Sequence, residues 1–114
     1  MEDASRLSRT AAIVLGNPEN RILVSAAVGW ELAIKVSTGK MKPRSILESL
    51  HRTLEEAAFS ELPITLEVAV RAGLLPPHHR DPFDRMLVAQ AQSLKVPVLS
   101  ADAVLDRYEI KRLW

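Results

Sequence analysis

The sequence predicts an α/β fold in which helices flank a mainly parallel sheet. Short apolar runs alternate along the chain with longer segments of helical periodicity, and turn-forming residues separate the two kinds of segment. No internal repeat, low-complexity stretch or long linker divides the 114 residues. We therefore expect a single domain over residues 1–114, built around one hydrophobic core.

The predicted strands are short apolar runs bounded by turn signals. They cover Arg21–Ser25, Glu61–Thr65, Val96–Ser100 and Ile110–Trp114. Pro63 indicates an edge or strand-end position for the second of these, because proline cannot donate to a ladder of hydrogen bonds. The last run is expected to form an edge strand.

Helices are expected before, between and after these strands. The predicted segments run from about Ser8 to Leu15, from Ser25 to Gly39, from Ser45 onward, from Thr65 to about Gly73 and from Asp81 to about Leu94. The last begins most clearly, since Asp81 can cap the helix and Pro82 suits its first position. A short helical turn is expected to open at Asp102.

Composition narrows the function classes. Fifteen Lys and Arg residues nearly balance 14 Asp and Glu residues, giving a formal charge of +1, so the chain lacks the basic surplus of a dedicated nucleic-acid binder. Cysteine is absent, which excludes disulfides, thiolate metal sites and a cysteine nucleophile. No apolar run approaches the roughly 20 residues that span a bilayer, and the first residues do not resemble a signal peptide. We expect a cytoplasmic protein.

Two acidic residues follow predicted strands. Parallel α/β sheets bind ligands beyond the carboxyl ends of their strands, and Glu31 and Asp102 come shortly after such ends. Each also has a purely structural interpretation. Glu31 is placed to pair with Lys35 four residues later, and Asp102 is placed to cap a helix. From spacing alone, both interpretations stay open.

Asp81 and Asp84 share the first turn of a predicted helix. A capping role accounts for Asp81, whose side chain would satisfy free backbone amides. Asp84 is less settled, because the cap does not require a second acid. The neighbouring His78 and His79 lack the helical spacing of a zinc motif, so we do not expect them to bind metal.

No phosphate-binding glycine loop or nucleophilic triad is visible, so acids are the chemistry that the chain offers. Carboxylates that converge at one edge of a sheet suit hard cations such as Mg²⁺ or Mn²⁺. Such ions generate hydroxide and stabilise the attacking and leaving oxygens of a phosphodiester.

Several segments together resemble one known family. The chain is similar to PIN-domain toxins of the VapC type over Val24–Ala27, Trp30–Lys35, Leu62–Thr65, Leu75–Ala91 and Leu99–Asp102. The stretch from Leu75 to Ala91, which contains Asp81-Pro82-Phe83-Asp84-Arg85, is the most specific of these matches. The resemblance extends in order over essentially the whole chain.

The resemblance implies a three-layer PIN-like α/β fold and an Mg²⁺- or Mn²⁺-dependent endoribonuclease, the toxin of a type II toxin–antitoxin pair. RNA would be its substrate, an antitoxin its partner, and a homodimer its expected assembly. By position in the matching motifs, Glu31, Asp84 and Asp102 would be the catalytic and metal-binding acids. Asp81, Arg85 and Ser100 would support them.

The chain departs from the family pattern at its beginning. Members usually open with an apolar strand that ends in an aspartate, and this chain begins after the equivalent of that strand and acid. An upstream start, completion by another chain, or loss of activity would each explain the difference. The alternative function is therefore an inactive or incomplete PIN-like module that binds itself or an antitoxin. A DNA-binding role is disfavoured, because no basic recognition helix appears.

Overall fold

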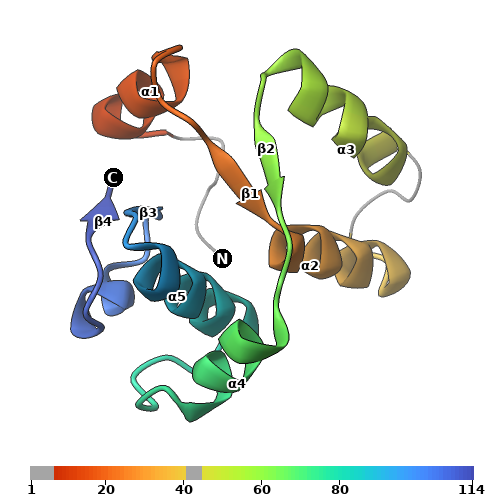
Figure 1. Ribbon diagram of the computed structural model, residues 1–114. Helices are drawn as coiled ribbons and strands as arrows, with labels where there is room; N and C mark the ends of the chain where they lie inside the picture. Colours follow the sequence, from red (N-terminus) through yellow and green to blue (C-terminus); the bar gives the residue numbers. More distant parts are fainter. Residues whose placement is uncertain (1–6, 41–44) are drawn as a thin grey trace. The chain divides into compact units, whose positions relative to one another are not determined.

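The computed structural model describes residues 7–40 and 45–114, with side chains described for residues 7–40 and 50–114. Over this part of the chain, five α-helices, one short 3₁₀ helix and two pairs of parallel strands form an α/β fold (Figure 1). The predicted fold class is therefore confirmed. The chain divides into two compact units, one of residues Arg21–Ile64 and one of the remaining described residues.

The larger unit, called unit 1, carries most of the C-terminal half of the chain. Its elements are α1 (Arg9–Gly16), α4 (Leu66–Leu74), α5 (Pro82–Leu94), β3 (Val98–Leu99), the 3₁₀ helix η1 (Ala103–Arg107) and β4 (Arg112–Leu113). Strand β3 pairs with β4 in parallel, with Val98 opposite Arg112 and Leu99 opposite Leu113. This pairing fixes the point at which the chain leaves β3 toward Asp102.

Side-chain caps define where the helices of unit 1 begin. The Thr65 hydroxyl accepts a hydrogen bond from the backbone N–H of Val68, and the Asp81 carboxylate accepts from the N–H groups of Phe83 and Asp84. Both caps satisfy amides that have no partner within the helix. The predicted starts of these two helices are confirmed. Helix α5 ends at Leu94, and the next residue, Lys95, adopts a left-handed conformation with φ of 57°.

The core of unit 1 forms on both sides of α5. On one side, the small residue Ala89 packs against Val68 and Ala72 of α4, so the two helices lie close together (Figure 1). On the other side, Val88 and Ala91 join a second cluster with Val98, Leu105 and Tyr108. Burial of each such valine or leucine stabilises the fold by about 1.5–3 kcal/mol. Helix α5 is thereby held between α4 and the β3–η1 segment.

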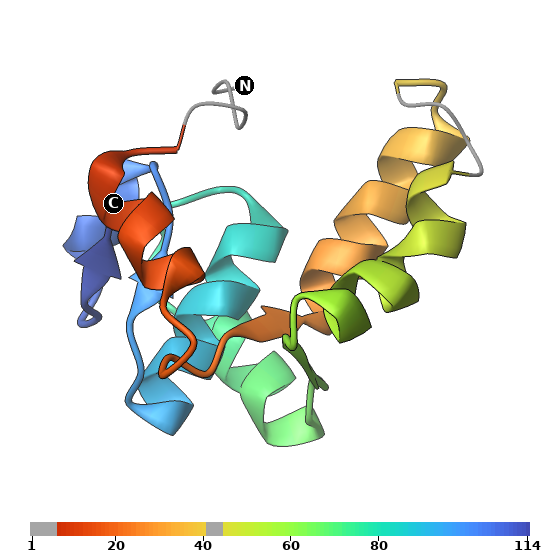
Figure 2. The ribbon, with the colours of Figure 1, turned by 90° about the horizontal axis from the view of Figure 1, so that it is seen from above.

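The smaller unit, called unit 2, contains β1 (Leu23–Ser25), α2 (Ala26–Ser37), α3 (Ser45–Glu56) and β2 (Ser60–Leu62). Strands β1 and β2 are parallel, and the buried Ser25 ends β1 and caps α2. Helices α2 and α3 lie side by side (Figure 2). Helix α2 ends two residues before Gly39, which adopts a positive φ of 77° that glycine tolerates.

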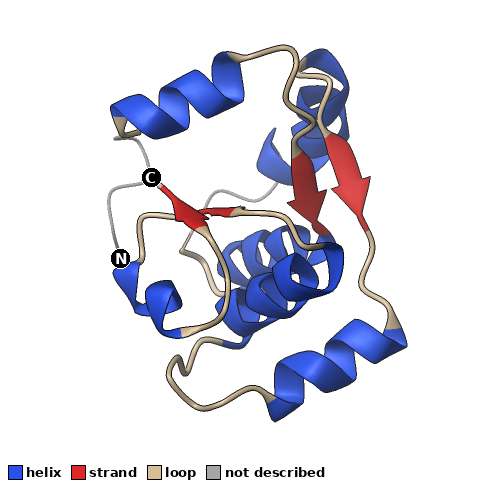
Figure 3. Cartoon of the chain, turned by 60° about the vertical axis from the view of Figure 1, so that its left-hand side comes forward, coloured by secondary structure: helices blue, strands red, loops and turns tan. Residues whose placement is uncertain are grey.

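The strands are shorter than the sequence predicts. Strand β2 begins at Ser60 and ends before Pro63, and β3 begins only after Pro97, so both prolines lie outside the ladders. Proline has no N–H group to donate, which explains both limits. The described strands form two separate two-stranded pairs, seen as red arrows in Figure 3. No described helix is long and apolar enough to cross a membrane.

Candidate metal centre

Asp84 is positioned by the start of helix α5. Asp81 caps this helix through Oδ1, which accepts hydrogen bonds from the N–H groups of Phe83 at 2.8 Å and Asp84 at 3.4 Å. Pro82 occupies the first turn, where no N–H is needed. The Asp84 carboxylate lies three residues after the cap and is half-buried. The capping interpretation of Asp81 is therefore confirmed. The Asp84 carboxylate does not cap the helix and contacts His79.

Asp102 is positioned by the turn that follows β3. The Ser100 hydroxyl accepts a hydrogen bond from the Asp102 N–H at 3.1 Å, and Asp102 Oδ1 accepts from the Val104 N–H at 3.0 Å. The Arg112 guanidinium donates to the Ser100 carbonyl at 3.1 Å. Asp102 thus caps η1 through Oδ1, and its Oδ2 lies 2.7 Å from His79 Nε2.

The loop between α4 and α5 is fixed by two side chains. Arg85 donates to the carbonyls of Ala72, Gly73 and Leu75 at 3.0–3.2 Å, where α4 ends. The Tyr108 hydroxyl donates to the Pro76 carbonyl at 2.7 Å and accepts from the His79 N–H at 2.9 Å. Backbone groups of a loop that would otherwise depend on water therefore have protein partners.

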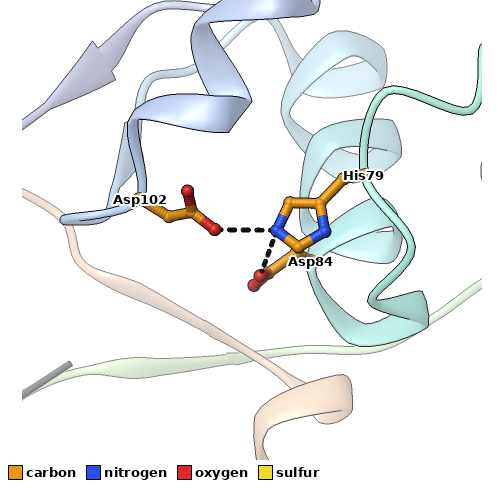
Figure 4. Close-up of side chains that lie close together, drawn as sticks. All are labelled: His79, Asp84 and Asp102. Atoms are coloured by element: carbon orange, nitrogen blue, oxygen red, sulfur yellow. Dashed lines mark hydrogen bonds and ion pairs between the residues drawn. The ribbon is translucent and has the colours of Figure 1, made fainter. Parts of the chain in front are cut away.

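His79 joins the two acids, as Figure 4 shows. Its Nε2 lies 2.7 Å from Asp102 Oδ2 and 3.0 Å from Asp84 Oδ2. Its Nδ1 accepts a hydrogen bond from the Asp81 N–H at 3.1 Å. The exposed fractions of the His79, Asp84 and Asp102 side chains are 15%, 27% and 34%, so the cluster lies open to solvent on the side of the acids.

The electrostatics of the cluster favour an ionised Asp102. The hydrogen bond from the Val104 N–H holds the pKa of Asp102 below its ordinary value of 3.8, although burial acts in the opposite direction. The hydrogen bond from His79 and the charge of Arg112 lower this pKa further. Hydrogen bonds to the charged form have this effect because they stabilise the carboxylate but not the carboxylic acid.

The donor set fits a divalent cation. Oxygens of Asp84 and Asp102 and a nitrogen of His79 lie within 4.8 Å of one another, so the two carboxylates are close enough to share one ion. Two carboxylates with access to solvent are ligands that Mg²⁺ and Mn²⁺ prefer, with water completing the coordination. An ion bound there would reverse the local negative charge and attract a phosphate group.

The structure brings together some, but not all, of the site residues that the sequence predicts. Unit 1 brings together Asp84 and Asp102, with Ser100, Asp81 and Arg85 in the contacts described above. Glu31 is half-buried on α2 of unit 2, so its part in a metal site stays a prediction.

His79 was missed by the sequence reasoning. Spacing rules for zinc helices do not apply to a residue on a loop, and its role here is to contact two carboxylates. The signal that points to it is its place two residues before the cap of the helix that carries Asp84.

The fold and this arrangement of acids limit the families to which the chain could belong. A comparison with protein-family models identifies the family. The model of the PIN domain matches residues 2–111, nearly the whole chain. The chain belongs to the PIN domain family. PIN domains are generally metal-dependent nucleases, and the His79–Asp84–Asp102 cluster of this PIN domain is one that could hold a metal ion. The chain matches none of the curated proteins or solved structures with which it was compared.

Proposed function

We propose that this PIN domain is an Mg²⁺- or Mn²⁺-dependent endoribonuclease that hydrolyses RNA phosphodiesters as the toxin of a type II toxin–antitoxin pair in the cytoplasm. The observation that carries the proposal is the convergence of the Asp84 and Asp102 carboxylates on one nitrogen of His79. The nuclease character of PIN domains supports the reaction class. The toxin role, the antitoxin partner and the choice of RNA rest on the resemblance to VapC-type toxins.

The two carboxylates would hold the ion and orient it toward substrate. When bound, a divalent cation lowers the pKa of a coordinated water and stabilises charge on the phosphate oxygens. Asp102 is suited to this task because its hydrogen bonds keep it ionised at neutral pH. Asp84 is suited because its Oδ2 lies 3.0 Å from the same His79 nitrogen that Asp102 contacts, which brings the two carboxylates together.

The remaining site residues have unequal support. The hydrogen bonds of Asp81, Arg85 and Ser100 to backbone groups near the cluster support positioning roles for all three. Glu31 enters the proposal as a further metal ligand on the resemblance alone.

Cleavage of RNA by the purified protein tests the proposal. With Mn²⁺ we expect endonucleolytic fragments, and Asp84→Asn or Asp102→Asn should each lower the rate about 10²-fold or more, because several kcal/mol of metal-dependent stabilisation would be lost. The matched control is Asp106→Asn, which makes the same change at an exposed acid of η1. Failure of the wild-type protein to cleave, with metal binding unchanged in Asp84→Asn, would contradict the proposal.

A second candidate function is pairing with another copy of this chain without catalysis. One observation favours such pairing: α4 exposes an apolar stripe of Leu66, Val70 and Leu74, whose exposed fractions are 83%, 54% and 80%. Glu67 and Arg71 lie beside this stripe at a spacing of four residues. Two antiparallel copies would place each Glu67 opposite the other copy's Arg71, as a two-fold symmetric interface requires.

Sedimentation of wild-type protein and Val70→Glu tests this pairing. The stripe predicts a dimer that Val70→Glu converts to monomer, whereas Leu94→Glu, at another exposed leucine, should remain dimeric. If the wild-type dimer cleaves no RNA and binds no Mn²⁺, the binding module is the better description.

A further inference from the structure

We infer that His79 is a positioning residue for the nuclease site: it holds the Asp84 and Asp102 carboxylates together through its Nε2–H and is not itself a ligand of the metal. The inference rests on the proposed function for its meaning in catalysis, but its structural part can be tested without RNA. Three observations carry it: the hydrogen-bond partner of Nδ1, the two contacts of Nε2, and the attachment of the loop.

The tautomer follows from the partner of Nδ1. This nitrogen accepts the Asp81 N–H at 3.1 Å, so it carries no hydrogen of its own. A hydrogen on Nδ1 would set two N–H groups against each other at that distance. The ring hydrogen is therefore on Nε2. A nitrogen that carries a hydrogen has no lone pair to give to a cation, so this ring orientation excludes ligation through Nε2.

Nε2–H is directed at the place where the acids meet. Asp102 Oδ2 lies 2.7 Å and Asp84 Oδ2 3.0 Å from Nε2, so the donor is shared between the two carboxylates. Two carboxylates this close repel each other, and a donor between them offsets that repulsion. Each carboxylate oxygen has two lone pairs, so a hydrogen bond from His79 leaves capacity for an ion.

The ring can act in this way only if its loop is fixed. The His79 N–H donates to the Tyr108 hydroxyl at 2.9 Å, and the His79 carbonyl accepts from Arg85 at 3.4 Å. With only 15% of its side chain exposed, His79 has little freedom to turn away from the acids. Such partners of metal ligands orient the ligands, and their removal costs about 10–100-fold in metal affinity or activity.

Two substitutions of His79 distinguish the effect of its N–H donor from the effect of its side-chain volume. Gln at position 79 places an amide N–H near the position of Nε2, whereas Leu provides similar volume and no donor. We expect His79→Leu to lower kcat about 10–100-fold with little change in the KM for RNA. His79→Gln should recover most of this loss, and the control His78→Gln at the exposed neighbouring position should behave as wild type. Equal losses in His79→Leu and His79→Gln, with thermal stability unchanged, would overturn the inference.

The deciding measurement is nitrogen NMR of the imidazole rings in ¹⁵N-histidine-labelled protein, before and after addition of Mg²⁺. The chain has three histidines, so His51→Gln and His78→Gln assign the His79 signals. We expect the Nε2–H form without metal and the same form with Mg²⁺ bound. A ring that carries its hydrogen on Nδ1, or that changes to that form when Mg²⁺ binds, would overturn the inference. Absence of RNA cleavage in the wild type would instead contradict the proposed function and leave this measurement valid.

Discussion

At the scale of single residues, the Asp102 carboxylate both caps a helix and belongs to the acidic site. Asp102 accepts the Val104 N–H through Oδ1 and faces His79 through Oδ2. Asp81 is a helix cap that does not face the His79 ring with its carboxylate. Its Oδ1 accepts hydrogen bonds from two N–H groups of α5, and its backbone N–H donates to His79 Nδ1. The first turn of a helix therefore fixes the position of each acid. The two acids differ in whether a carboxylate oxygen faces the candidate metal centre.

Substitution of Asp81 should affect stability according to its capping role. Asp81→Ala removes the acceptor and is expected to lower the free energy of unfolding by about 1 kcal/mol, whereas Asp81→Asn keeps an acceptor and should lose less than half of that. Urea unfolding of the two variants measures the difference. Equal destabilisation by Ala and Asn would show that capping is not the contribution of Asp81.

Asp106 provides a pH-dependent contribution outside the metal centre. Its hydrogen bond from Arg112, at 2.9 Å, and the charge of that residue hold the pKa of Asp106 below 3.8 in the folded protein. A lowered folded pKa stabilises the fold above the unfolded value, and the contribution disappears as the pH falls below 3.8 through the folded pKa.

The unfolding free energies of wild type and Asp106→Asn should therefore differ at neutral pH and converge below pH 3.8. Thermal unfolding at a series of pH values measures this, with Glu109→Gln as a control at another exposed acid. A difference that persists or grows toward low pH would contradict the assignment.

Some residues of the site could be identified from the sequence alone, and others could not. Asp84 and Asp102 were selected by local rules, since a helix start and the end of a strand are visible in the sequence. His79 lies two residues before a helix cap, but its orientation depends on its loop, which is held by Tyr108, 29 residues later, and by the guanidinium of Arg85. Contacts between distant residues set that geometry, and no spacing pattern along the chain encodes them.

At the scale of elements, Arg85 links the end of α4 to the start of α5. Its guanidinium donates to carbonyls at the end of α4 and to the Pro76 and His79 carbonyls of the following loop. Carbonyls at a helix end lack partners within the helix, and a planar group with five N–H donors can serve several of them at once. The loop that carries His79 thereby becomes part of the helix pair.

Replacement of Arg85 by lysine should loosen this connection even though the charge is kept. We expect Arg85→Lys to lower the free energy of unfolding by about 1–3 kcal/mol, because backbone carbonyls lose their partner. Hydrogen exchange at the His79 amide should become faster in the same variant. Arg80→Lys, on the exposed part of the loop, is the matched control. Unchanged exchange at His79 in Arg85→Lys would show that the loop is held in another way.

The boundaries of the elements were predictable where caps define them and less so where prolines interrupt strands. Thr65 and Asp81 mark the starts of α4 and α5 as the sequence indicates. The strand runs were predicted too long at Pro63 and Pro97, because apolar character continues past the residues that can join a ladder. Which strands pair is a non-local property, and the structure supplies it as β1 with β2 and β3 with β4.

At the scale of the whole molecule, the described residues form two compact units, and the His79–Asp84–Asp102 cluster belongs to one of them. A ligand that binds only the folded state stabilises it by an amount that grows with the ligand concentration. At about 100 times the dissociation constant, this amounts to about 2.7 kcal/mol. Mn²⁺ should therefore raise the unfolding temperature of the wild type but not that of the double variant Asp84→Asn/Asp102→Asn. An equal rise in both proteins would place the ion elsewhere.

Calorimetric titration with Mn²⁺ asks directly whether Asp84 and Asp102 bind the divalent cation of this PIN domain. We expect saturable binding to wild type and to Asp106→Asn, with affinity lowered about 10²-fold in Asp84→Asn and in Asp102→Asn, since each loses a charged ligand. Equal Mn²⁺ affinity in all four proteins, or no binding to the wild type, would contradict this expectation.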